Sequence, residues 1–115
     1  MCDYKLKKDY LPMSESAYYM LLAFCETKHG YGVIQYVNQI TNGRIKLGPG
    51  TIYGTISRFE KDKLIISAGD QERRKLYKLT PLGSQLLQME IQRLNELYGN
   101  GKKYGGYENE KNKGI

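Results

Sequence analysis

A glycine-proline-glycine step stands directly before a stretch with helical periodicity, and it constrains this chain more than any other feature. From Gly48 the sequence is GPGTIYGTISRF. Gly48 suits an N-cap, and Pro49 suits the first helical position because an N–H there would have no partner within the helix. The expected buried face of this helix is a stripe of three apolar residues, Ile52, Ile56 and Phe59. The sequence therefore predicts a helix that begins at this step.

The opposite face of the predicted helix is small, hydroxylic or basic. Its residues are Thr51, Gly54, Thr55, Arg58 and Lys61. Gly50 lets a phosphate approach the unpaired N–H groups and the positive end of the helix dipole. Thr51 and Thr55 can donate hydrogen bonds to phosphates or base edges, and a helix of this width fits the major groove of DNA. A tight strand-to-helix turn would also explain the glycines.

The positive charge of the chain is concentrated in its middle third. The 115 residues, which suit one small domain, include 18 basic and 12 acidic side chains, for a net charge of +6. Residues 44–78 alone hold nine of the basic and four of the acidic side chains. Such a confined excess favours a patch for a polyanion, with a merely soluble surface as the alternative.

The periodic segments follow one another in the order of a winged helix. Ser14 is a good N-cap, and Asn42 with Gly43 tolerates the left-handed turn that ends a helix. In this fold the second and third helices form a helix-turn-helix, and the hairpin is the wing. The expected elements are helices over 14–28 and 31–42, an edge strand over 44–47, a helix from 48, and a hairpin of strands 64–66 and 73–79 with its turn at 68–70.

A longer helix and a polar tail complete the chain. Thr80 and Pro81 open this helix, which we expect to end near Tyr98. The tail is glycine-rich, charged and nearly without aliphatic residues, so we expect it to be disordered. The predicted fold class is mainly α with a small β-hairpin, a winged helix-turn-helix plus a long C-terminal dimerisation helix. The predicted divisions are an N-terminal segment 1–13, a winged helix-turn-helix domain 14–80, the C-terminal helix 81–98 and the tail 99–115.

Two stretches of the sequence resemble the PadR family of bacterial transcriptional regulators. They are HGYGVIQYVNQITNGRIKLGPGTIYGTISRFEKDKLI and ERRKLYKLTPLG, and the resemblance covers about residues 14 to 85. The matching motifs are the HGY helix start, the GPGTLY-like turn, the LI strand and the RRKYY-like wing strand. The chain departs from the family pattern at Gly54, where proline is frequent, and at Lys63, where glycine is common and a positive φ is often preferred. The resemblance implies a repressor that dimerises through its long terminal helix.

The DNA-binding residues are expected on the third helix, at the start of the second helix and on the wing. Strand alternation puts Arg74 and Lys75 on opposite faces, so the basic wing residues cannot all contact DNA in the same way. Tyr31 is equally explained as a packed aromatic residue, and Tyr53 as a residue at the edge of the core. The candidate residues are Tyr31, Gly32, Pro49, Gly50, Thr51, Tyr53, Thr55, Arg58, Arg73, Arg74 and Lys75.

One apolar stripe runs along the terminal helix. It comprises Leu86, Leu87, Ile91, Leu94, Leu97 and Tyr98. Folding back onto the domain would bury this stripe, but the helix is too long for so small a domain to cover, so we expect two copies to pair through it. A pocket for a small aromatic or apolar effector is expected at that interface, lined by Tyr18, Met89 and Tyr98.

The sequence does not indicate an enzyme. His29, the single histidine, stands beside a glycine at a helix junction, where capping or a contact to the DNA backbone suits it better than catalysis. Cys2 and Cys25 are far apart, which suggests neither a disulfide framework nor a zinc site, and Cys25 is expected in the core of the first helix. No metal or other cofactor is indicated. There is no signal segment and no apolar run near 18 residues, so we expect the protein in the cytoplasm.

The predicted function is a homodimeric repressor that binds a pseudo-palindromic operator in double-stranded DNA. The alternative is a winged helix whose basic wing binds an acidic protein partner. A protein interface would require an exposed aromatic or aliphatic anchor on the third helix, which carries Thr51, Thr55 and Arg58 instead.

Overall fold

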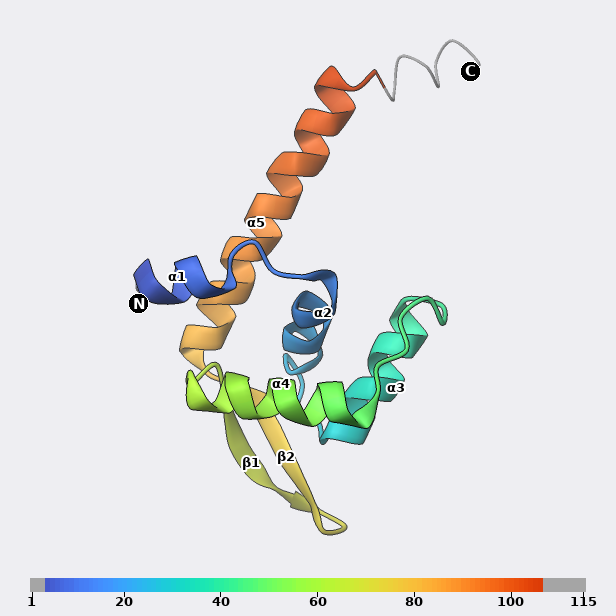
Figure 1. Cartoon of the computed structure of the whole chain (residues 1–115), viewed down its shortest axis with the longest axis vertical. Coiled ribbons are helices and arrows are strands. Elements are labelled where there is room, and N and C mark those ends of the chain that lie inside the picture. The colour runs from blue at the N-terminus through green and yellow to red at the C-terminus, as the bar shows by residue number, and fades with distance from the viewer. Residues whose placement is uncertain (1–3, 107–115) are drawn as a thin grey trace.

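The computed structural model describes residues 4–106, which form five helices and one two-stranded antiparallel hairpin. This mainly helical architecture with one hairpin confirms the predicted fold class. Helix α4 lies across the domain, the hairpin extends from one side of it, and α5 rises away from the domain (Figure 1). In chain order the elements are α1 (Tyr4–Tyr10), α2 (Glu15–Ala23), α3 (Gly30–Ile40), α4 (Pro49–Lys61), β1 (Ile65–Gln71), β2 (Arg74–Leu79) and α5 (Pro81–Tyr104).

The core lies where α2, α3 and α4 meet the first turns of α5 and the start of the hairpin. Ile52, Ile56 and Phe59 are buried, as their spacing predicted. Fully burying an aliphatic or aromatic side chain stabilises a fold by about 1.5–3 kcal/mol, so this cluster holds the elements together. Its fully buried members are Leu21, Phe24, Val33, Val37, Ile52, Phe59, Leu64, Ile65, Leu86 and Leu87.

The predicted helix starts are confirmed by their caps. Ser14 Oγ accepts a hydrogen bond from the N–H of Ala17 at 3.1 Å at the start of α2. Thr80 Oγ1 accepts one from the N–H of Gly83 at 3.0 Å at the start of α5. Gly48 is the N-cap of α4, with proline at the first helical position. Each side-chain cap contributes about 1 kcal/mol to its helix.

The segment after α2 differs from the prediction. Helix α2 ends at Ala23, and Cys25 is exposed beyond it, so the expected core position of Cys25 is wrong. The chain then pairs with β2, because the N–H of Lys28 donates to the carbonyl of Tyr77 at 3.0 Å and the N–H of Tyr77 donates to the carbonyl of Lys28 at 2.9 Å. This pairing occupies the outer edge of β2. The predicted edge strand over 44–47 is therefore wrong, and that segment is a loop.

The hairpin turn also lies elsewhere than predicted. Its central residues, Glu72 and Arg73, have φ values of 52° and 68°, so the expected turn at 68–70 is wrong. Gly69, with φ 103°, instead lies at a bulge in β1 where the register of the hairpin shifts. Two-residue turns with positive φ usually carry asparagine or glycine, so a glutamate-arginine pair gave no turn signal.

Helix α5 is longer than predicted. It continues past Tyr98 to Tyr104, so residues 99–104 are helical and the expected disorder is wrong there. Residues 107–115 of the predicted tail lie outside the described residues. Among the helices of the described chain, none combines the length and the apolar character needed to cross a membrane.

Candidate nucleic-acid interface

The N-terminus of α4 is open to solvent and needs none of its glycines for packing. Gly48, Pro49 and Gly50 are exposed, and no side chain caps the helix. Gly48 has a φ of −90°, and neither Gly50 nor Gly54 has a positive φ. A Cβ added at any of these three glycines would meet nothing within 4 Å. Neither backbone conformation nor packing within the chain therefore requires glycine at these positions, and the start of α4 is accessible to a group from outside the chain.

The outer face of α4 differs in part from the predicted one. Gly54 and Lys61 are exposed, as is Ser57, whereas Thr55 is half-buried. Helical spacing places Gly50, Gly54, Ser57 and Lys61 in one row opposite the buried stripe. Ser57 thus joins the candidate site. Its spacing from Gly50 and Gly54 was the sequence signal that could have identified it.

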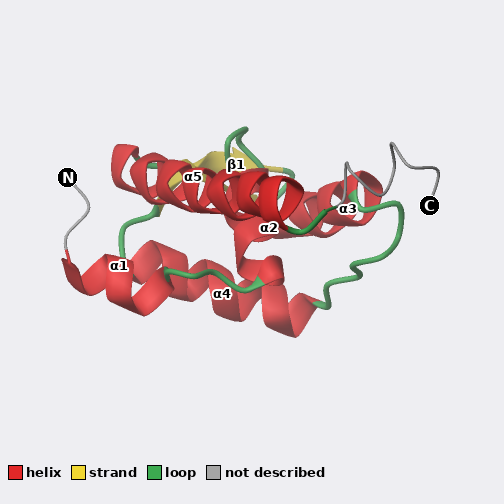
Figure 2. Cartoon of the chain, turned by 90° about the horizontal axis from the view of Figure 1, so that it is seen from above, coloured by secondary structure: helices red, strands yellow, loops and turns green. Residues whose placement is uncertain are grey.

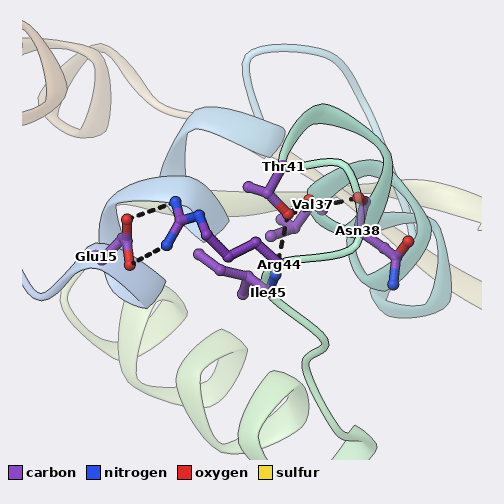
Figure 3. Close-up of polar contacts among 6 residues, drawn as sticks. All are labelled: Glu15, Val37, Asn38, Thr41, Arg44 and Ile45. Atoms are coloured by element: carbon purple, nitrogen blue, oxygen red, sulfur yellow. Dashed lines mark hydrogen bonds and ion pairs between the residues drawn. The ribbon is translucent and has the colours of Figure 1, made fainter.

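The loop before α4 is held in place by side-chain hydrogen bonds (Figure 3). Thr41 Oγ1 donates to the carbonyl of Val37 at 2.7 Å and accepts from the N–H of Ile45 at 3.1 Å. Arg44 donates two hydrogen bonds to the carboxylate of Glu15, at 3.0 and 2.7 Å, and this hydrogen bonding lowers the pKa of Glu15. The pair ties the loop to the start of α2, and so contributes to the placement of α4.

Tyr53 lies on the surface, against the N-terminus of α3. A Cβ on Gly30 would come within 2.7 Å of Tyr53 Cε1, so only glycine lets the ring lie this close to the α3 backbone. The ring is 52% exposed, which excludes a place in the core. The sequence left open whether Tyr53 faces the core edge or the surface, and the structure places it at the surface.

The wing is joined to the start of α3 by stacked side chains. The guanidinium carbon of Arg74 lies 5.2 Å from the centre of the Tyr31 ring. On α3, the Tyr31 ring stacks on the imidazole of His29, with an interplanar angle of 14°. His29 Nδ1 accepts a hydrogen bond from the N–H of Gly32 at 3.0 Å, which is the capping role expected for it. The starts of α3 and α4 and the wing therefore lie together.

The other three basic candidates lie at two places. Arg73 occupies the hairpin turn and Lys75 follows on β2, and both are exposed. At the other end of α4, the guanidinium carbon of Arg58 lies 4.4 Å from the centre of the Tyr10 ring. Arg58 Nη2 also donates to the carbonyl of Asp9 at 3.5 Å. Arg58 is thus turned toward α1, a contact that the sequence did not indicate.

The apolar stripe of α5 divides into a buried and an exposed part. Leu86 and Leu87 are fully buried in the core of the single chain, so their assignment to a dimer interface is wrong. The first turns of α5 face the domain, which covers them without a partner. Further along, the stripe changes from half-buried to exposed positions, namely Ile91, Leu94, Leu97 and Tyr98.

The effector pocket of Tyr18, Met89 and Tyr98 was expected at an interface between two copies, and it stays a prediction. Of the three, only Tyr18 lines a hollow of about 330 Å³ beside α5. Glu90 lies in its wall, and its buried carboxylate accepts hydrogen bonds from Arg93 at 2.7 and 2.8 Å. These bonds lower the pKa of Glu90. The lining residues are Met13, Glu15, Tyr18, Tyr19, Glu90 and Leu94.

Sequence comparison identifies one family and one partial relative. The family model described as "Transcriptional regulator PadR-like family" matches residues 20–89. An uncharacterized 37.1 kDa protein in transposon TN4556 of Streptomyces fradiae is 34% identical over 71 residues. The match covers 62% of this chain but only 20% of that protein, so the chain spans about a fifth of its relative's length.

Solved structures share the fold, and the family match gives the assignment. A transcriptional regulator from Clostridium thermocellum has a TM-score of 0.64 at 20% identity, over 87% of this chain and 97% of that one. Bacillus subtilis PadR in complex with operator DNA has a TM-score of 0.58 at 21% identity, over 70% of this chain and 48% of that one. At these identities the likeness shows a common fold. Because the family model spans the helix-turn-helix, the wing and the base of α5, this chain belongs to the PadR-like family of transcriptional regulators.

Proposed function

We propose that this chain is a sequence-specific DNA-binding regulator that acts as a homodimeric repressor. The observation that carries the proposal is the open N-terminus of α4, where no side chain caps the backbone N–H groups of the first turn and Gly50 has no side chain to cover them. Those groups and the positive end of the helix dipole suit a phosphate. Along the outer row of α4, small residues let the helix enter the major groove, and Thr51, Ser57 and Lys61 supply hydrogen-bond donors. Bacillus subtilis PadR, which was solved with operator DNA, has this fold.

The residues around α4 suit contacts to the DNA backbone. Tyr31 and Gly32 belong to the start of α3, where the helix dipole is again positive. Arg74, the first residue of β2, is held against Tyr31, so its charge is positioned between the start of α3 and the tip of the wing. Arg73 in the turn and Lys75 on β2 flank Arg74 and are exposed, so they are available to a phosphate backbone or the adjacent minor groove.

The proposed dimer uses the outer half of α5. Leu97 and Tyr98 are 54% and 65% exposed, and Leu94 is half-buried, on a helix that extends beyond the domain (Figure 1). Two copies that pair along this face would bury these residues and present two α4 helices to successive major grooves of a pseudo-palindromic operator. Occupancy of the operator then accounts for repression.

The proposed effector site is the hollow beside Tyr18. Tyrosine rings line it on α2, and Leu94 lines it on α5, close to the proposed dimer face. A small aromatic ligand there would act on the angle between α5 and the winged helix, and so on the spacing of the two α4 helices. In a thermal shift titration, such a ligand should raise the melting temperature of the wild type. It should not raise that of Tyr18→Ala.

DNA binding is tested by fluorescence anisotropy with DNA from upstream of the protein's own gene and with scrambled DNA, across a salt series. The wild type should prefer the upstream DNA, and its affinity should fall steeply as salt rises. Gly50→Leu should weaken binding at least tenfold, because it adds a side chain at the proposed phosphate site without an internal clash. Gly99→Leu is the matched control, since a Cβ on Gly99 also meets nothing within 4 Å. Equal binding of both DNAs, unaffected by Gly50→Leu, would contradict the proposal.

A further inference from the structure

Helix α1 is attached to α4, the proposed recognition helix, through one buried tyrosine. The hydroxyl of Tyr10 donates to Asp62 Oδ2 at 2.5 Å, and its ring packs on Phe59 with centres 6.1 Å apart. Arg58 covers the same ring and donates to the carbonyl of Asp9. Burial, together with the hydrogen bond to Asp62, raises the pKa of Tyr10 well above its usual value, so the hydroxyl remains a donor. Contacts with Arg58, Phe59 and Asp62 thus hold the end of α1 against the C-terminal end of α4.

This attachment brings like charges together. Lys5, Lys7 and Lys8 are exposed on α1. A hollow of about 260 Å³ separates Lys5 and Asp9 from the end of α4, where Lys61 and Lys63 line the opposite side with Asp62. Asp9 and Asp62 offset two of the three lysine charges around the hollow, so its lining carries a net charge of +1. Lys7 and Lys8, which are exposed on α1, add to this positive charge, and a positive surface of this kind attracts a polyanion.

The position of α1 suits a DNA backbone. Seen from above, α1 and α4 lie in one layer, whereas α3, α5 and the hairpin lie in the other (Figure 2). In the view of Figure 1, α1 lies on one side of α4 and the hairpin on the other. A helix in the major groove is bordered by two phosphate backbones, and the wing can contact only one of them.

We propose that α1 is a further DNA-contacting element, whose lysines bind the phosphate backbone on the side of α4 opposite the wing. This inference rests on the proposed function, because it takes α4 as the helix that enters the groove. The contacts carry no sequence information, so α1 adds affinity and a longer footprint rather than specificity.

The test is the double variant Lys5→Gln/Lys8→Gln, with Lys102→Gln/Lys103→Gln on α5 as the control of equal charge. Anisotropy titrations across a salt series should show weaker binding of upstream and scrambled DNA alike for the α1 variant. The slope of log K against log salt should fall by about 1–2, since each lost phosphate contact contributes about 0.9. The α5 variant should keep the wild-type slope. Tyr10→Phe retains all charges but loosens α1, and should weaken binding without changing the preference for upstream DNA.

The outcomes separate the two proposals. An α1 double variant with the wild-type affinity and slope, measured while Gly50→Leu binds weakly, would overturn the role of α1 and leave the role of α4 intact. Loss of the dimer in the α1 variant, seen by light scattering, would also overturn it, because the lysines would then serve a protein contact. Absence of DNA binding in the wild type would refute both proposals together.

Discussion

The α-carbon of Gly83 lies against the carbonyl oxygen of Leu64, so closely that a Cβ added to the glycine would stand 2.1 Å from that oxygen. The carbonyl cannot move away easily, because it accepts hydrogen bonds from the N–H of Thr80 at 3.0 Å and from its hydroxyl at 3.1 Å. This contact sets how closely α5 approaches the hairpin. It therefore fixes the direction in which the terminal helix leaves the DNA-binding domain.

Gly83→Ala is expected to destabilise the fold by at least about 3 kcal/mol, because the added methyl group meets backbone atoms that are held in place. Gly99→Ala on the same helix is the control. Its Cβ meets nothing within 4 Å, so the gain in helix propensity should stabilise the protein by about 0.5–1 kcal/mol. Urea denaturation of both variants measures the two effects. Equal stability of the two variants would show that the contact between α5 and the hairpin is not tight.

Glu90→Gln is expected to cost about 2 kcal/mol, since it removes charge-assisted hydrogen bonds from a buried position. The carboxylate also accepts from the N–H of Met13 at 3.1 Å, and so joins the segment before α2 to α5. Glu15→Gln, at the exposed pair with Arg44, is the control and should change stability much less. Chemical denaturation at neutral pH compares them.

The same pair of variants tests a pH dependence. The pKa of Glu90 is lowered in the folded state, chiefly by its hydrogen bonds to Arg93. The unfolded chain therefore binds more protons near pH 4 than the folded chain does. The contribution of Glu90 to the free energy of unfolding is fully present above the usual glutamate pKa of about 4.3, and it is lost as the pH falls through the lower pKa of the folded state. Glu90→Gln should flatten the acid limb of the stability curve. An acid limb with the wild-type slope would contradict the assignment.

Helices were predictable where a cap, a periodic stripe and a breaker agreed. Ser14, Gly48 and Thr80 marked three starts correctly, and Asn42 with φ 53° ended α3 as expected. The hairpin was harder, because its turn at Glu72 lacks the residues that favour a positive φ, while Gly69 supplied a turn signal that belongs to a bulge. The geometry of β1 depends on its pairing with β2, and a local sequence pattern does not indicate which residues of the two strands pair.

The sequence predicted the exposed start of α4 in the candidate site, but it did not predict the contacts between distant segments around it. The open start of α4 follows from local glycine chemistry, so Gly50 was found correctly as an exposed position. The contacts of Arg58 with Tyr10 and of Tyr53 with Gly30 join segments far apart in the chain, and the sequence pattern does not encode such distances. The two ends of the apolar stripe on α5 could not be told apart, because only the packed domain decides that Leu86 is covered.

Lys63 offers a test of backbone strain at the end of α4. Its φ of 63° is in the left-handed region, where a side chain costs about 1 kcal/mol and glycine costs little. Lys63→Gly should therefore stabilise the protein by about that amount. Lys61→Gly removes the same charge from within α4 and should destabilise it by about 1 kcal/mol. Thermal denaturation of the two variants should give shifts of opposite sign, and shifts of the same sign would refute the strain.

Gly30→Ala is expected to weaken DNA binding while changing stability little. A Cβ on Gly30 would come within 2.7–3.0 Å of three atoms at the end of the Tyr53 ring, so the exposed ring must swing away from α3 and lose its position against the start of that helix. The three atoms nearest to the added Cβ all belong to the outer end of this exposed side chain, which can turn away, and this limits the cost in folding free energy. A double-mutant cycle by anisotropy with upstream DNA checks this cause. In the Tyr53→Ala background, Gly30→Ala should have no further effect, because no ring is left to displace. An undiminished effect in that background would mean that Gly30 acts through the start of α3 itself, and Tyr53 would then have no positioned role in the interface.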